Sequence, residues 1–311
     1  MKTIMEKWPP GHFYSVIPNI SKKSEEEESK NPSRYPSLPP FMNLNFHDDR
    51  HVTIIEDLPD YLGFFDQIFG VNSFENKDDL YRQIGERTQR LCYSLMNQSF
   101  EGMDARLLFY FVQKNKPKRI IEIGCGNSTL LLWNTKKIFG LDVEITCIEP
   151  YPHPFIKKMR DKGHIHLLES DLQEIELTLF STLEENDILF IDSSHVGKHK
   201  SDVLFYFSKI FPLLRKNVLI HIHDIFFPYD YPQSWLEEGR FWNEQYFLFM
   251  FLQYNTKFSI VFGNKYSEYK FPDKLRQLQK NSYERQHGFV KKEDVFSGGS
   301  LWLIVETDEI E

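Results

Sequence analysis

A short, mostly apolar run that ends in a glycine-rich turn constrains the fold of this chain more than any other stretch. The run spans residues 120–123 and is typical of a buried parallel strand. Gly124 and Gly126 allow a sharp turn and a close approach of bare backbone to a ligand. Ser128 and Thr129 can then cap a helix. A strand, a glycine turn and a helix N-terminus in this order predict a nucleotide or nucleoside pocket.

The residue types around the turn narrow the choice of nucleotide. A dinucleotide fingerprint would place a third glycine at position 129, where this chain has Thr129. Glu122, inside the strand, can accept a hydrogen bond from an ammonium group. Glu149, at the end of the next apolar strand, can accept from both hydroxyls of a ribose. This Glu-x-Gly-x-Gly turn with a strand-ending Glu resembles the S-adenosylmethionine site of class I methyltransferases.

The resemblance implies a set of cofactor contacts. After the third expected strand, Asp171 matches the polar residue that hydrogen-bonds the adenine amino group in this family. A helix cap before Leu172 explains the same residue type equally well. The residues expected to bind S-adenosylmethionine are Glu122, Gly124, Cys125, Gly126, Ser128, Glu149, Pro150, Asp171 and Asp192.

Strands and helices alternate through the rest of the chain, which predicts an α/β fold with a doubly wound, mostly parallel sheet. Over about residues 100 to 306, the pattern resembles the seven-stranded, Rossmann-like sheet of class I methyltransferases. The expected strands span residues 120–123, 144–148, 164–168, 187–191, 218–223, 258–262 and 300–305, with the last two antiparallel. The expected organisation is an N-terminal arm and acidic linker (1–50), a helical cap (51–115) and the S-adenosylmethionine-binding domain (116–311).

The segments before the first strand have different characters. An acidic, low-complexity run at 22–30 predicts a solvated linker. The aromatic cluster at 8–15 has two interpretations, an arm packed on the core or an arm that closes over the substrate. The second would make His12 and Tyr14 acceptor contacts. Helical spacing of apolar residues between 58 and 113 predicts helices, which in class I methyltransferases cover the cofactor and contribute to the acceptor pocket.

Four titratable side chains follow the fourth and fifth expected strands. Asp192 and His195 come after the fourth strand, and His223 and Asp224 come after the fifth. Because the carboxyl ends of adjacent parallel strands meet at one edge of a sheet, we expect these four side chains to form one cluster beside the methyl donor. We call this cluster the mouth. Period-two alternation puts His221 on the same face but deeper, as a core histidine.

Two chemistries fit this cluster. In metal-dependent O-methyltransferases, an Asp after the fourth strand and an acidic pair after the fifth hold a divalent cation that binds and acidifies the acceptor hydroxyl. Asp192 and Asp224 match those positions, and His223 replaces the first acid, which suits zinc, iron or manganese better than magnesium. The alternative is metal-free, with His195 or His223 as the general base. A third interpretation has both acids only capping helices.

An aromatic segment follows the fifth strand, where insertions often wall the acceptor site in methyltransferases. Tyr229, Tyr231, Trp235 and Trp242 can stack on a sugar ring or an aromatic acceptor. Arg240 can hold a carboxylate or phosphate of that acceptor. The alternative is a lid closed by its own aromatic rings, with Arg240 paired to a nearby Glu.

Composition argues against several other functions. The chain has 311 residues, a net charge of -8 and no sustained basic stripe, which disfavours nucleic acid as the main partner. No run approaches the roughly 20 apolar residues of a membrane-spanning helix. Cys92, Cys125 and Cys147 show neither paired spacing nor metal-ligand spacing, which favours a reduced, cytoplasmic setting. The sequence leaves both a monomer and a homodimer open.

Segments along nearly the whole chain are similar to a bacterial group of uncharacterised class I methyltransferases, of the type called methyltransferase domain 24. The similar segments are residues 10–15, 191–195, 221–226, 238–244 and 298–302. The resemblance implies S-adenosylmethionine as the methyl donor. We expect transfer to an oxygen of a small-molecule or sugar-like acceptor, with or without a divalent metal cation. Two other classes stay open, an NAD-dependent oxidoreductase on a related sheet and a non-methylating metal- or ligand-binding protein on the same fold.

Overall fold

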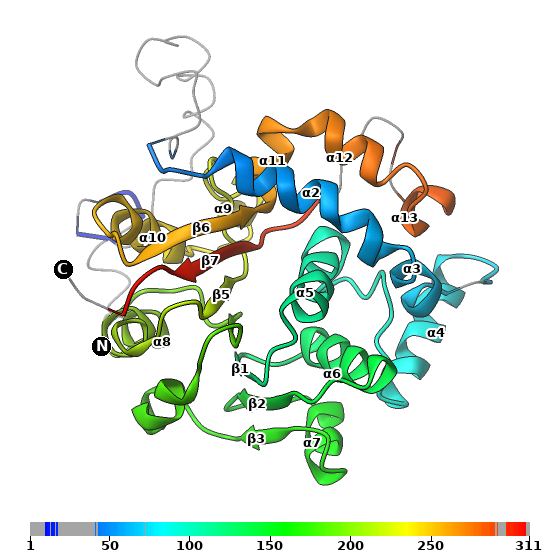
Figure 1. The fold of residues 1–311 in the computed structure, drawn as a ribbon, viewed down its shortest axis with the longest axis horizontal. Helices are drawn as coiled ribbons and strands as arrows, with labels where there is room; N and C mark the ends of the chain where they lie inside the picture. The colour runs from blue at the N-terminus through cyan, green and yellow to red at the C-terminus, as the bar shows by residue number, and fades with distance from the viewer. Residues whose placement is uncertain are drawn as a thin grey trace.

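The computed structural model describes residues 10–12, 14, 15, 17, 41, 43–71, 73–289, 291 and 297–308. Its centre is a seven-stranded sheet with the order β3-β2-β1-β4-β5-β7-β6 (Figure 1). The strands are β1 (Arg119–Ile123), β2 (Glu144–Ile148), β3 (His166–Leu168), β4 (Ile188–Ile191), β5 (Leu219–Ile222), β6 (Phe258–Gly263) and β7 (Leu301–Val305). The first five are parallel, and β7 runs antiparallel to both β5 and β6. The predicted α/β class and the antiparallel last pair are confirmed. The acidic linker lies outside the described residues.

Helices cover both faces of the sheet (Figure 1). No helix in the described part of the chain is both long enough and apolar enough to cross a lipid bilayer. The α-helices are α2 (Asp48–Leu62), α3 (Phe65–Phe69), α4 (Lys77–Gln89), α5 (Gly102–Asn115), α6 (Asn127–Phe139), α7 (Pro154–Asp161), α8 (Asp202–Phe205), α9 (Gln233–Glu237), α10 (Glu244–Gln253), α11 (Asn264–Lys270), α12 (Pro272–Leu278) and α13 (Tyr283–Gln286). The chain also forms the short 3-10 helices η2 (Leu172–Glu174), η3 (Leu177–Thr182) and η5 (Phe211–Leu213), and the π-helix η4 (Tyr206–Ile210).

Neighbouring residues of each central strand enter different hydrophobic clusters, one on each face of the sheet. In β1, Ile120 belongs to the first cluster and Ile121 to the second, and Ile188 and Leu189 of β4 divide in the same way. Successive side chains of a strand point to opposite faces, so continuously apolar strands require cover on both sides. The first cluster includes α2, α3, α5, α6 and α7. The helices predicted before the first strand therefore share a core with the sheet, and α2 begins slightly earlier than residue 51.

A buried ion pair fixes α5 against its neighbours. Arg106 is 1% exposed and donates to Asp66 at 2.6 Å and to the two oxygens of Glu284 at 2.7 and 2.8 Å. Asp66 belongs to α3 and Glu284 to α13, so one guanidinium holds three segments together. Breaking such a buried pair costs about 3–5 kcal/mol because a charge is left without its partner. The first turn of α5 is thereby held in a fixed place.

Backbone hydrogen bonds align the carboxyl ends of the central strands. Asp192 N donates to Ile123 O at 2.9 Å, and His223 N donates to Ile191 O at 2.9 Å. The residues that follow β1, β4 and β5 therefore lie along one edge of the sheet. Ligands of open parallel sheets bind at this edge.

Candidate functional site

The turn after β1 depends on Gly124. Its φ is +80°, and a Cβ at this position would lie 1.8 Å from the carbonyl oxygen of Asp192. Any side chain would therefore push the end of β1 away from the end of β4. Gly126 has a φ of -172°, and a Cβ there would meet no atom within 4 Å. The sequence predicted a similar role for both glycines, but the packing requires glycine only at position 124.

Helix α6 begins directly after this turn. The Thr129 hydroxyl accepts from Gly126 N at 3.0 Å, so Thr129 caps the helix as predicted. The prediction that Ser128 also caps it is wrong, because the Ser128 hydroxyl donates to Glu122 at 2.6 Å. A buried carboxylate on β1 competes successfully for that hydroxyl.

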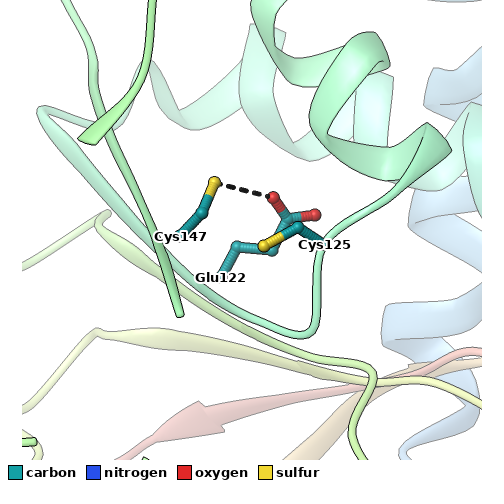
Figure 2. A group of neighbouring side chains, drawn as sticks. All are labelled: Glu122, Cys125 and Cys147. Carbon is teal, nitrogen blue, oxygen red and sulfur yellow. Dashed lines mark hydrogen bonds between the residues drawn. The ribbon is translucent and has the colours of Figure 1, made fainter. Parts of the chain in front are cut away.

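Glu122, Cys125 and Cys147 form a buried group between the turn and β2 (Figure 2). Their oxygen and sulfur atoms lie within 4.8 Å of one another, a proximity that the cysteine spacing did not suggest. The Glu122 carboxylate accepts from Thr129 Oγ1 at 2.7 Å and from Cys147 Sγ at 3.4 Å, in addition to Ser128. The contact with Cys125 and then burial raise the pKa of Cys147 well above its ordinary value. The Cys147 thiol therefore stays protonated, and the group holds α6 against β1 and β2.

Replacing Glu122 by glutamine is expected to remove a pH dependence of stability. Glu122 is 0% exposed, and burial raises its pKa from 4.5 to about 7 in spite of its hydrogen bonds. The unfolded chain ionises this carboxyl first, so the folded state loses up to about 3 kcal/mol of stability as pH rises from 4.5 to 7. Urea unfolding of wild type and Glu122→Gln at pH 5 and pH 8 measures this difference. The same change with pH in both proteins would contradict the prediction.

A cleft of about 490 Å³ opens at the carboxyl ends of β1 and β2, a volume that suits a small-molecule ligand. Some of the residues predicted to bind S-adenosylmethionine are absent from its wall, and their cofactor contacts stay predictions. These are Glu122, Cys125, Gly126 and Ser128. The predicted residues that line the cleft are Gly124, Glu149, Pro150, Asp171 and Asp192.

Asp171 stands immediately before η2, where the sequence allowed either an adenine contact or a helix cap. Its side chain makes no capping hydrogen bond, so the cap interpretation is not supported. The cleft wall also includes polar residues of the loop after β4 and the first residue of α8, which sequence analysis missed because a loop has no periodic pattern. They are Ser193, Ser194, Lys198, Lys200, Ser201 and Asp202.

The structure brings the four predicted mouth residues together. His223 Nδ1 lies 3.5 Å from Asp192 and 3.4 Å from Asp224. His195 Nε2 lies 3.3 Å from Asp192 and 3.8 Å from Asp224. Two imidazoles thus stand between the two carboxylates. His221 is fully buried with Nε2 2.7 Å from Ser300 Oγ, which confirms its prediction as a core histidine.

Each of the two mouth histidines also lies beside a further acid that sequence analysis missed. Glu244, at the start of α10, lies 2.7 Å from His195 Nδ1 and also accepts from Tyr206. Asp104, in the first turn of α5, lies 3.4 Å from His223 Nε2. Asp104 had one visible signal, since it is a carboxylate on an otherwise largely apolar helix. Both side chains orient an imidazole and add negative charge to the mouth.

The surrounding acids favour the protonated form of both imidazoles. Burial alone would lower the pKa of His195, but hydrogen bonds to Asp192 and Glu244 outweigh it and raise the pKa to about 10. Burial likewise opposes protonation of His223, but Asp192 and Asp224 raise its pKa well above 6.5. A histidine that holds its proton so firmly is a poor general base at neutral pH. The metal-free interpretation is weakened for His195 for that reason, whereas His223 would have to lose its proton either to act as a base or to bind a cation.

The mouth also has the donor set of a cation site. Asp192, His223 and Asp224 place one ligand atom each within 4.8 Å of the others. His223 is 7% exposed, and neither of its ring nitrogens has a hydrogen-bonded partner in the described part of the chain. Two carboxylates and a neutral imidazole suit a divalent transition metal, and a cation bound there would take the place of the proton on His223.

The aromatic segment after β5 forms the lid that the alternative interpretation described. Arg240 pairs with Glu238 at 2.9 Å and lies over the rings of Trp235 and Trp242, at 5.0 and 5.7 Å from their centroids. The Trp242 ring stacks on His195 with centroids 4.1 Å apart. The lid therefore contacts the mouth through Trp242. A contact between Arg240 and the acceptor would require breaking the ion pair with Glu238.

A second cavity, of about 960 Å³, adjoins the mouth on the side of α5. Asp104 and Gly299 line it, and Gly299 packs directly against Asp224. Tyr229 and Trp235 are also on its wall. Of the other residues predicted to contact the acceptor, Tyr231 is 5% exposed within the lid. The half-buried His12 and the exposed Tyr14 line neither this cavity nor the cofactor cleft. Acceptor contacts of Tyr231, His12 and Tyr14 stay predictions.

Comparisons with known proteins bear on the same part of the chain. A family model described as a methyltransferase domain matches residues 121–225. An uncharacterised protein of Archaeoglobus fulgidus is 31% identical over 183 residues, 58% of this chain and 76% of that protein. The S-adenosylhomocysteine-bound methyltransferase PaMTH1 of Podospora anserina has a TM-score of 0.37 and 18% identity, over 79% of this chain and 92% of that one. The plantazolicin methyltransferase BpumL has a TM-score of 0.41 and 15% identity, over 82% and 99%.

The family match runs from β1 to the residues just after β5, and so contains the glycine turn, the strand-ending Glu149 and the mouth. The sheet order and its antiparallel last pair are those expected for the same family. The chain belongs to the class I S-adenosylmethionine-dependent methyltransferases.

Proposed function

We propose that this methyltransferase acts on a hydroxyl oxygen of a small, ring-containing acceptor and uses a divalent cation to do so. One observation carries the proposal. Asp192 lines the cofactor cleft and also belongs to the mouth cluster with His223 and Asp224. A methyl donor in the cleft and an acceptor hydroxyl at the mouth would therefore both lie next to Asp192.

The residues of the cleft, the mouth and the second cavity would have separate roles. Gly124, Glu149 and Asp171 would bind the donor, whose sulfonium supplies an electrophilic methyl group. The second cavity would hold the acceptor with its hydroxyl toward the mouth. In-line transfer needs the two groups oriented and the hydroxyl proton removed, and the walls of the cleft and of the second cavity would provide the orientation.

Asp192, His223 and Asp224 would hold the cation, with Asp104 orienting the His223 ring. When bound, a divalent cation lowers the pKa of a coordinated hydroxyl and so assists its deprotonation near neutral pH. His195 would stay outside this set, fixed by Glu244 at 2.7 Å. His195, protonated and stacked on Trp242, would then hydrogen-bond Asp192 and hold it in position. It would not act as the base that deprotonates the acceptor.

Chelation followed by metal add-back is expected to remove and restore turnover. Release of S-adenosylhomocysteine is measured with catechols, phenols and monosaccharides as acceptors, before and after treatment with a chelator. Manganese, zinc, iron(II) and magnesium are then added separately. We expect at least about a tenfold loss and its recovery with a transition metal, because loss of the cation removes the acidifying group. Calorimetry with S-adenosylhomocysteine on the chelated protein is the control, and should show retained binding.

Full activity in the metal-free protein would reject the cation and return proton removal to a histidine. Transfer to nitrogen or sulfur acceptors alone would reject the oxygen specificity. The family assignment already favours methyl transfer over the oxidoreductase alternative, so a test with nicotinamide cofactors is a secondary control.

A further inference from the structure

The second cavity has a marked excess of acidic over basic side chains among the described residues. Its wall carries four carboxylates and two cationic groups, together with aromatic rings. The acids are Glu101, Asp104, Glu268 and Glu284, the cations are Lys265 and Arg276, and the rings are Phe226, Tyr229, Trp235 and Phe289. Such a wall fits a ring compound that brings its own positive charge.

Both cations of this wall already have acidic partners. Lys265 Nζ lies 2.9 Å from each carboxylate oxygen of Glu268. Arg276 lies 2.6 Å from Asp273, which is outside the cavity wall. Glu284 is held by the buried Arg106. Neither cation is left to neutralise the remaining acids of the wall, Glu101 and Asp104.

Asp104 and Glu101 differ in the number of hydrogen bonds that their carboxylates accept. Asp104 accepts from Asn264 at 2.6 Å and from the backbone N–H groups of Gly299 and Ser300 at 3.1 and 2.8 Å. Glu101 accepts one backbone hydrogen bond, from Gln98 N at 2.9 Å, and has no ion pair among the described residues. Burial, and then the nearby acids Glu284 and Asp104, raise the pKa of Glu101 above its usual range. A cation beside Glu101 would relieve this cost.

Both acids stand at the start of α5. Glu101 is the residue immediately before α5, and Asp104 lies in its first turn. Both side chains line the second cavity, and Asp104 is close enough to Glu101 to help raise its pKa. Asp104 also lies 3.4 Å from Nε2 of His223, one of the mouth residues. A group bound at Glu101 therefore shares the cavity with Asp104, the acid that lies beside His223 of the mouth.

We propose that the acceptor is an amino alcohol built on a ring, whose protonated amine pairs with Glu101 while its hydroxyl points to the mouth. The proposal rests on the proposed function, since it names the class of acceptor for the same site. Amino sugars and hydroxylated aromatic amines share this chemistry. The rings of Phe226, Tyr229 and Trp235 can pack against either kind of ring face.

Calorimetry with two matched pairs of compounds tests the proposal. The pairs are glucosamine with glucose, and dopamine with 4-methylcatechol, each titrated into full-length protein with S-adenosylhomocysteine and manganese. In at least one pair the amine is expected to bind about tenfold more tightly than its neutral partner, since it adds one charge-assisted hydrogen bond. The pair that responds distinguishes an amino sugar from an aromatic amine. In Glu101→Gln the preference is expected to fall below about twofold, with the affinity of the neutral partner unchanged.

Glu237→Gln is the matched control, because it removes an equal charge from the exposed end of α9, outside the cavity wall. It should keep the preference for the amine. Equal affinity within both pairs, absence of binding by all four compounds, or a preference that survives in Glu101→Gln would overturn the proposal. Methyl transfer is measured separately. Amine binding without transfer would count against the proposed function alone, and transfer to neutral acceptors without charge preference would count against this inference alone.

Discussion

Replacing Gly124 by alanine is expected to abolish cofactor binding and to destabilise the fold. The new Cβ would lie 1.8 Å from a backbone oxygen of Asp192, and the φ of +80° disfavours every residue with a side chain. Since the obstacle is backbone, the ends of β1 and β4 must separate. We expect a loss of at least about 3 kcal/mol in the free energy of unfolding. The affinity for S-adenosylhomocysteine should fall by more than about 100-fold.

Urea unfolding and calorimetry measure the two quantities, and Gly126→Ala is the control from the same turn. Its Cβ meets no atom within 4 Å and its backbone is extended, so its stability should change by less than about 1 kcal/mol. If both variants lose stability to the same extent, the clash with Asp192 is not what makes Gly124 necessary. Unchanged binding by Gly124→Ala would remove the turn from the cofactor site.

Replacing Asp224 by asparagine is expected to reduce kcat by about 100-fold or more, because one of three proposed cation ligands loses its charge. Asp224 has a φ of +57°, a conformation that asparagine tolerates well, so the substitution changes charge with little backbone strain. Asp224 does not line the cofactor cleft, and the affinity for S-adenosylhomocysteine should stay within about twofold of wild type.

Steady-state kinetics across a range of manganese concentrations makes this test specific for a cation. The rate of Asp224→Asn should recover in part at high manganese, because weaker binding is offset by mass action. Asp142→Asn, an exposed acid just before β2, is a charge-matched control that should behave as wild type. A variant that keeps full activity at low manganese would exclude Asp224 from the proposed site.

The sheet could be predicted from the sequence because its strands are short apolar runs separated by turn residues. The expected ranges of β1 and β2 agree with the structure within one residue. β3 is shorter than predicted and begins at His166, since it lies at the edge of the sheet and pairs only with β2. The first residues of that apolar run have no second neighbouring strand to extend the ladder.

The mouth residues could also be predicted, because parallel strands bring their carboxyl ends to one edge whatever the details of packing. Asp192, His195, His223 and Asp224 were found in this way. Residues that reach the same place from helices carry no such signal. Glu244 lies 49 residues from His195 in sequence, and only the packing of α10 brings it within 2.7 Å.

The sequence by itself determined the class of fold, the position of the glycine turn and the four polar residues at the strand ends. These features follow from local patterns and from one topological rule. Only the tertiary structure decided which acids surround His195 and His223, and so how strongly each imidazole favours its protonated form. It also decided that Arg240 pairs with Glu238, and that Glu101 lines a cavity and forms no ion pair among the described residues. Charge states and free partners depend on groups that are distant in sequence and close in space, and folding alone brings those groups together.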